Sequence, residues 1–254
     1  MSNTNQLAQL TLDGPVARLA LNRPDARNAL SLDLLGAMHQ EVDRLQSRAP
    51  GGPHVLIISG VGKSFCAGMD LKAVLDNNRL ALELLTSLAE WTLKIRRLPM
   101  VVVASVNGAA IGGGCGLACV CDLAITHADS KMGYPEVDLG VCPAVVAPWL
   151  VRKVGAGRAR KILLTGGLMS GREAHACGMV DVLCESASQL DETVESVARR
   201  LASGGSNALA ATKGLLNQLD GSLDDSIVMR GAQLSAQVLA TPEAQSRLRA
   251  KFSS

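Results

Sequence analysis

The stretch NGAAIGGGCGLACVCD, residues 107–122, is the most informative part of this sequence. It contains four glycines within five positions: Gly112, Gly113, Gly114 and Gly116. Each glycine weakens a helix by about 1 kcal/mol relative to alanine, so helix stability does not explain the run. Glycine also removes the side chain that keeps other groups away from the backbone. The stretch therefore predicts a strand-to-helix turn that a ligand approaches closely.

A second glycine-rich loop, GVGKSFCAGMDL, lies at residues 60–71. It ends like a phosphate-binding P-loop, but that motif needs a glycine where Ile57 stands. Either loop alone is most simply a tight turn. Together, two loops at the ends of neighbouring strands can direct two free backbone N–H groups at one developing oxyanion.

Composition limits the class of protein. The chain has 254 residues, 48% of them hydrophobic, and a net charge of +2. Aromatic residues make up only 2% and no basic run occurs, which argues against nucleic-acid binding. The seven cysteines lack metal-ligand spacing, so we expect no metal and a reducing compartment. With no signal peptide or membrane span in the sequence, we expect a cytoplasmic protein.

Hydrophobic periodicity predicts alternating strands and helices. The expected strands lie at 7–12, 16–21, 54–59, 100–106, 122–126 and 179–183. Helices are expected from Ser31, at 77–97, 145–154, 158–164 and 172–177, and throughout the chain from Ser188 onward. Two strand–glycine loop–helix units start nearly 46 residues apart, which hints at a repeated ββα unit. We expect an α/β core at 1–190 and a helical region at 191–254.

Four segments resemble the signature segments of one known family, in order and in spacing. They are NRPDARNALS (22–31), SFCAGMDLK (64–72), NGAAIGGGCGLACVCDLAI (107–125) and KMGYPEVDLG (131–140). This is the crotonase, or enoyl-CoA hydratase/isomerase, superfamily. The resemblance implies a spiral of ββα units with a C-terminal helical region. It also implies an acyl-CoA thioester substrate, with no separate cofactor.

The resemblance also assigns roles by position. The thioester oxygen would sit between the backbone N–H groups of Met69 and Gly113. Five residues fall where relatives contact coenzyme A: Ala26, Arg27, Asp70, Leu71 and Lys72. The family forms trimers, often paired into hexamers, and apolar residues at helical spacing in the 191–254 region would supply such an interface.

Acid–base chemistry is expected from one residue. Family hydratases commonly use two glutamates, at the positions of Glu136 and Gly116, and only the first is present here. We expect burial to raise the pKa of Glu136, which suits proton transfer. A single carboxylate fits a one-acid hydratase, and it also fits an isomerase that moves a double bond.

The segment 141–166 favours the hydratase. It is similar to the PAVxxP pattern of bacterial hydratases related to methylglutaconyl-CoA hydratase. The isomerase remains an alternative, and so does a non-catalytic protein that binds acyl-CoA or RNA.

Overall fold

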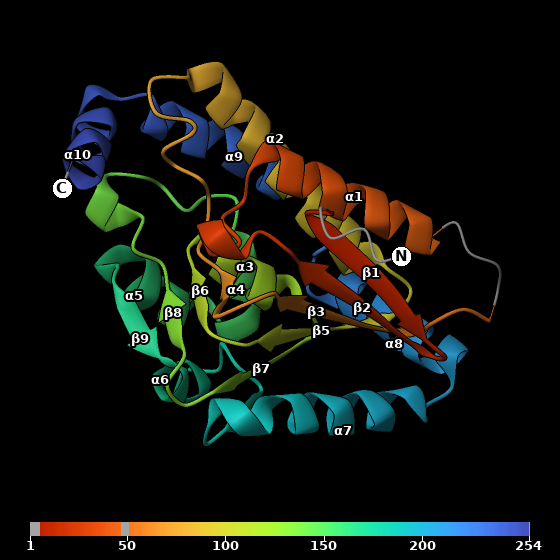
Figure 1. Ribbon diagram of the computed structural model, residues 1–254. Coiled ribbons are helices and arrows are strands. Elements are labelled where there is room, and N and C mark those ends of the chain that lie inside the picture. Colours follow the sequence, from red (N-terminus) through yellow and green to blue (C-terminus); the bar gives the residue numbers. More distant parts are fainter. Residues whose placement is uncertain (1–5, 47–50, 254) are drawn as a thin grey trace.

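The computed structural model describes residues 6–46 and 51–253 (Figure 1). The larger of two sheets has six strands in the order β1-β2-β3-β5-β7-β10. Their bounds are β1 Ala8–Asp13, β2 Val16–Leu21, β3 Val55–Gly60, β5 Val101–Val106, β7 Leu123–His127 and β10 Val182–Cys184. β1 and β2 form the expected antiparallel hairpin, and every later pairing in this sheet is parallel.

The second sheet is built from short strands that the sequence did not predict. These are β4 Ser64–Cys66, β6 Ala109–Ile111, β8 Lys131–Gly133 and β9 Leu168–Ser170, in that order across the sheet. Each of the successive pairs β3–β4, β5–β6 and β7–β8 contributes one strand to each sheet. Val55 pairs with Val101 in the first sheet, so the spacing of 46 residues is a structural repeat.

Ten α-helices surround the sheets within the described residues. They are α1 Leu32–Gln46, α2 Asn78–Arg97, α3 Gly113–Val120, α4 Ala147–Val154, α5 Ala156–Thr165, α6 Gly171–Ala176, α7 Leu190–Ala202, α8 Ser206–Leu219, α9 Asp225–Leu239 and α10 Pro242–Phe252. Side-chain caps start several of them. The Asn77 side chain accepts from Leu80 N, and that of Thr241 accepts from Ala244 N.

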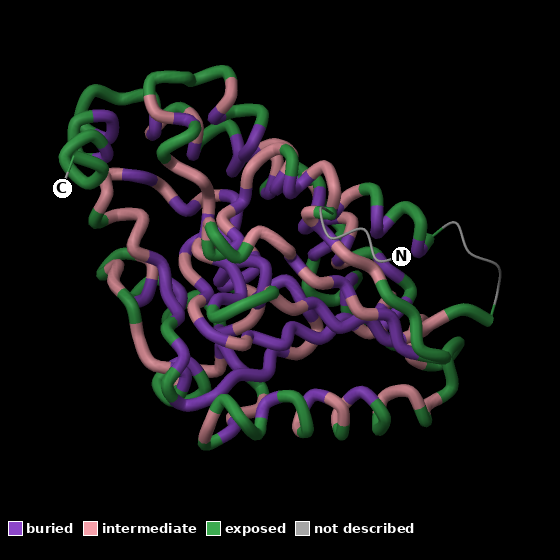
Figure 2. The backbone as a smooth tube through the Cα atoms, viewed as in Figure 1, coloured by how far each residue is buried: buried purple, intermediate pink, exposed green. Residues whose placement is uncertain are grey.

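Alternation along the strands sorts side chains to two faces of the large sheet. Leu56 and Ile58 of β3 face the main core, together with residues of α1 and α2. Val55 and Ile57 face the other side, where α7 covers the sheet (Figures 1 and 2). Both faces of β3 are therefore buried, as its continuous apolar run predicted.

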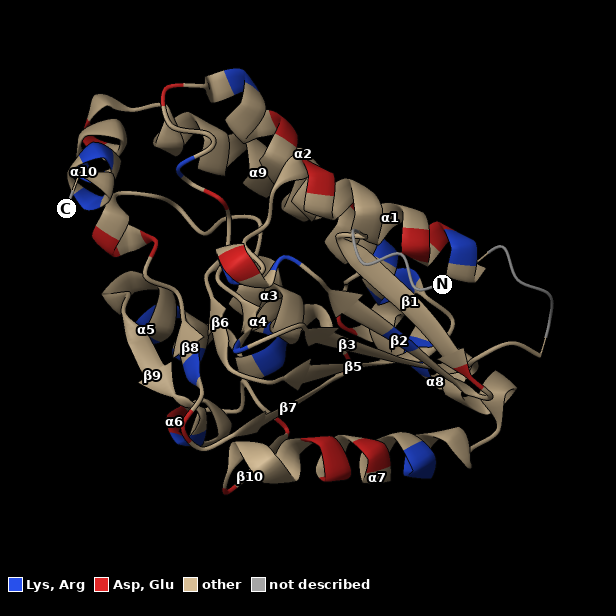
Figure 3. Cartoon of the chain, viewed as in Figure 1, with Lys and Arg blue, Asp and Glu red and all other residues tan. Residues whose placement is uncertain are grey.

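The helical region after residue 190 packs on the rest of the chain. α9 lies along α2 and makes the most extensive contact between any two described elements. Leu215, Leu216, Ile227 and Leu234 remain exposed on its outer surface, whereas Val228 is buried. Acidic and basic residues both occur along α1 and α7 (Figure 3). The proposed division at residue 190 and the trimeric or hexameric assembly stay predictions.

One strand begins later than expected. We predicted a strand near 179–183, but β10 covers Val182–Cys184. The amides of Met179 and Val180 donate to Ala174 O and close the end of α6 instead. Pairing with β7 can therefore start only after them.

Candidate active site

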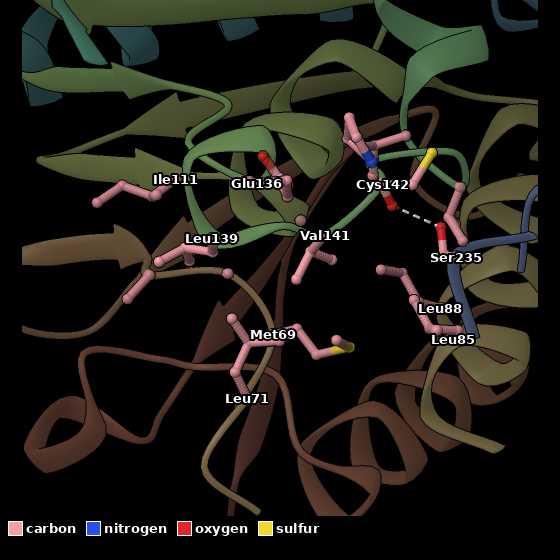
Figure 4. Close-up of a pocket in the computed structure, with 17 residues that line it drawn as sticks. Met69, Leu71, Leu85, Leu88, Ile111, Glu136, Leu139, Val141, Cys142 and Ser235 are labelled. Carbon is pink, nitrogen blue, oxygen red and sulfur yellow. Dashed lines mark hydrogen bonds between the residues drawn. The ribbon is translucent and has the colours of Figure 1, made fainter. Parts of the chain in front are cut away.

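A mainly apolar cavity of about 110 Å³ lies where the two glycine-rich loops meet α2 and the segment after β8 (Figure 4). Its apolar lining includes Met69, Leu71, Leu85, Leu88, Ile111, Leu139, Val141, Val145 and Val146. The polar side chains in the lining are those of Glu136, Cys142 and Ser235. The structure thus brings the 64–72, 107–125 and 131–140 segments to one cavity.

The backbone nitrogens of Met69 and Gly113 lie close together at this cavity. A Cβ built on Gly113 would be 3.7 Å from Met69 N, and one built on Gly68 would be 3.6 Å from Gly113 N. Gly113 is the first residue of α3, where helix N–H groups have no intrahelical partner. Within the described part of the chain, neither nitrogen donates a hydrogen bond. Two free donors therefore face one cavity.

Glu136 presents its carboxyl group at the turn that precedes α3. A Cβ built on Gly112 would lie 2.5 Å from Glu136 Oε1, so only glycine fits there. Gly112 also has a φ of +54°, which favours glycine. Glu136 Oε2 is shielded from solvent and has no hydrogen-bond partner among the described residues. Burial raises the pKa of this carboxyl group from its ordinary value of 4.5 to about 7.

The position of Gly116 offers no room for a second acid. A Cβ built there would lie 2.1 Å from Cγ1 of Val146, a side chain that is only 2% exposed. Gly116 and Gly113 are separated by one turn of α3, and Val146 lines the cavity. An apolar side chain from a distant segment therefore fills the space above Gly116.

The segment that carries Val146 is fastened to α9. Ser235 Oγ donates to Cys142 O over 2.7 Å and accepts from Ala144 N over 3.1 Å (Figure 4). One turn earlier on α9, a Cβ built on Gly231 would lie 2.4 Å from Ala144 O. We did not predict these residues, because α9 is about 90 residues away in sequence and carries no motif.

The predicted coenzyme A residues occupy two loops that are hydrogen-bonded to each other. Ala67 N donates to Arg27 O over 3.0 Å, and Leu30 N donates to Gly68 O over 2.8 Å. Ala26 ends a short 3₁₀ turn beside them. Leu71 lines the cavity, and Lys72 is exposed at the end of its loop.

Asp70 and Arg27 have structural features that the sequence did not reveal. The Asp70 carboxylate pairs with Arg23 over 2.9 Å, so it links the two loops. Arg27 is exposed and has a left-handed φ of +51°. The assignment of these residues to coenzyme A stays a prediction.

Two asparagines hold the loops in place and were missed as individual residues. Asn28 is fully buried and donates through Nδ2 to Val61 O and Ser64 O. Asn107 donates through Nδ2 to Gly60 O and Gly62 O. Both stand in segments quoted above, and asparagine tolerates the left-handed φ of +55° found at position 28.

Two further searches covered the described residues. Over 6–46 and 51–253, no cluster of three His, Cys, Asp or Glu side chains is arranged to hold a metal ion. None of the helices in those ranges combines the length and apolar character needed to cross a bilayer.

Comparison with known proteins agrees with the fold. The sequence profile of the enoyl-CoA hydratase/isomerase family matches residues 12–247. A Clostridium acetobutylicum protein named short-chain-enoyl-CoA hydratase is 32% identical, over 82% of this chain and 80% of its own. A crotonyl-CoA hydratase from Syntrophomonas wolfei is 34% identical, over 80% of this chain and 78% of its own.

A solved structure extends the similarity to three dimensions. The crystal structure of an enoyl-CoA hydratase from Mycobacterium avium superposes with a TM-score of 0.86 at 30% identity, covering 98% of this chain and 97% of that one. This chain belongs to the enoyl-CoA hydratase/isomerase family. The predicted crotonase-type fold is thereby confirmed, and the chain is an enzyme of the hydratase type.

Proposed function

We propose that this enzyme adds water across the 2,3-double bond of an enoyl-CoA thioester, with Glu136 as its single acid–base residue. The observation that carries the proposal is the Glu136 carboxyl group, whose shielded Oε2 has no partner among the described residues, at the same cavity as two free backbone donors. A carboxyl group with a pKa near 7 can both accept and return a proton at neutral pH.

The proposed reaction uses the groups already described. The Glu136 carboxylate accepts a proton from water as the hydroxyl oxygen bonds to C3 of the substrate. Electrons of the double bond move towards the thioester, and the N–H groups of Met69 and Gly113 stabilise its oxygen as negative charge develops. Glu136 then returns the proton to C2, so that one water molecule is added and the carboxylate is regenerated.

The direct test is to supply purified protein with but-2-enoyl-CoA and identify the product. Hydration removes the conjugated double bond and yields the 3-hydroxyacyl thioester, which chromatography and mass spectrometry identify. A protein that binds this thioester yet forms no hydroxyacyl product would contradict the proposal. Exposed acids on α2 supply matched control variants, Glu83→Gln and Glu90→Gln.

An isomerase is the second candidate, and one observation favours it. Val146 fills the space above Gly116, so the cavity offers one carboxylate and few other polar groups to hold a water molecule. An isomerase needs only that carboxylate, which would move a proton between two carbons of the acyl chain. Conversion of a 3-enoyl-CoA into the conjugated 2-enoyl isomer, without a hydroxyacyl product, would identify this reaction.

A further inference from the structure

We propose that Val146 determines substrate specificity by restricting the acyl group to a short, uncharged chain of about four carbons. This inference rests on the proposed acyl-CoA function of the cavity. It concerns a residue whose side chain fills the space beside Gly116 and lines the cavity. The proposal follows from four features of the cavity: the position of Val146, the size of the space, the fixed wall that carries Val146 and the chemistry of the lining.

The first feature is the position of Val146 relative to the free donors. The face of α3 that carries Gly113 also carries Gly116, one turn or about 4.5 Å further along. Leu88 lies against Gly113, at 3.6 Å from the position of its Cβ, and Val146 lies against Gly116. A chain that begins at the Gly113 donor and runs along α3 therefore meets Val146 within its first few carbons.

The second feature is size. The cavity is partly open to its surroundings and has a volume of about 110 Å³. An apolar protein cavity of about 150 Å³ accommodates benzene, which has six carbon atoms, so the same ratio gives about four carbons here. The surrounding side chains Leu85, Leu88 and Val145 are themselves buried, and close packing leaves them little freedom to move aside.

The third feature is that the wall carrying Val146 is fixed on both sides. Ser235 holds the backbone on either side of residue 143 through two hydrogen bonds, and α9 approaches it closely at Gly231. On the other side, Val146 rests on Gly116 of α3. The valine therefore cannot withdraw without disturbing two helices.

The lining also excludes one kind of acyl group. Among the cavity residues, Glu136 is the one charged side chain, and none is Lys, Arg or His. An acyl chain that ends in a carboxylate would bury a second negative charge near Glu136 with no cation to pair with it. The cavity therefore suits an uncharged chain rather than the dicarboxylic type suggested by the resemblance of segment 141–166.

The variant test compares Val146→Ala with Val194→Ala. Val194 is a buried valine on α7, against the opposite face of the large sheet, so it matches the loss of side-chain volume away from the cavity. The measured quantity is the ratio of kcat/KM for hex-2-enoyl-CoA to kcat/KM for but-2-enoyl-CoA, which should be low in the wild type. We expect Val146→Ala to raise that ratio at least about tenfold, within the range for added methylenes in apolar pockets. An unchanged ratio in the folded variant would overturn the proposal.

A binding test needs neither turnover nor a variant. Calorimetry with wild-type protein should show butanoyl-CoA binding at least about tenfold more tightly than octanoyl-CoA, and pentanoyl-CoA more tightly than glutaryl-CoA of the same length. Equal affinities within either pair would overturn the proposal. If no enoyl-CoA is hydrated but binding follows this pattern, the proposed reaction fails while the restriction to short, uncharged acyl chains stands.

Discussion

Position 136 lines the cavity, whereas position 116 lies behind Val146, which lines it, and the two positions differ in almost every physical respect. At 136 a glutamate presents a carboxyl oxygen that is shielded from water and has no partner among the described residues. At 116 there is no side chain, and Val146 from another segment occupies the space. This chain therefore has a polar side chain at the first position and an apolar side chain in the space beside the second.

The Glu136 carboxyl group is suited to proton transfer, whereas the Val146 side chain is suited to packing. Shielding an unpaired carboxyl group disfavours its charged form, which is why the pKa of Glu136 rises to about 7. Contact between Val146 and α3 contributes ordinary apolar packing. A group that is unfavourable for folding and poised near neutral pH is a strong candidate for catalysis.

The largest expected effect comes from removing the carboxyl group of Glu136. Glu136→Gln keeps the size of the side chain but cannot accept a proton, so kcat should fall by roughly 10²–10⁴. Acyl-CoA affinity should change little, because the two backbone donors remain. Glu83→Gln and Glu90→Gln should keep wild-type rates. A Glu136→Gln enzyme within about threefold of wild type would show that another group transfers the proton.

The next effect should come from removing one backbone donor. Gly113→Pro deletes the N–H at the first position of α3, where proline is compatible with a helix. Losing one oxyanion donor typically lowers kcat by roughly 10²–10³. Met69→Ala keeps its backbone N–H and should lose less than tenfold by the same steady-state assay. Near-normal turnover by folded Gly113→Pro would place the thioester oxygen elsewhere.

A smaller effect is expected from placing a glutamate at position 116 as well as at position 136. Gly116→Glu drives its Cβ into Val146, and such overpacking commonly costs about 1–3 kcal/mol of stability. Chemical denaturation should show this loss, without faster hydration. Gly116→Glu combined with Val146→Ala should recover only part of the stability, since the contact with Cγ1 is removed while Cβ of residue 146 still lies 2.5 Å from the new Cβ. Full stability in the single variant would show that Val146 yields easily.

The strands of the large sheet and the helices around it could be predicted because their apolar and polar residues recur at short, regular spacings. Alternation revealed β1 and β2, and the continuous apolar runs of β3 and β5 revealed strands buried on both faces. The strands of the second sheet have three residues each, too few for any period to emerge. Their existence depends on pairing across the spiral.

The candidate site was predictable to a similar extent. Glu136, Met69 and Gly113 stand within local motifs, so their positions in those motifs were enough to identify them as candidates. The structure brings all three to one cavity. The contact of Val146 with Gly116 joins positions 30 residues apart, and no short motif records it. The same holds for Ser235, whose role depends on how α9 packs.

The most direct test of a single catalytic carboxylate is the dependence of kcat/KM on pH. Because the carboxylate is the form that accepts the proton, and burial raises the pKa of Glu136, the rate should increase as the pH rises through about 7. If one group ionises, a plot of log(kcat/KM) against pH should rise with a slope of one below the pKa. This rise should be absent from the residual activity of Glu136→Gln. A slope of two, a midpoint near the ordinary value of 4.5, or the same rise in Glu136→Gln would contradict the account.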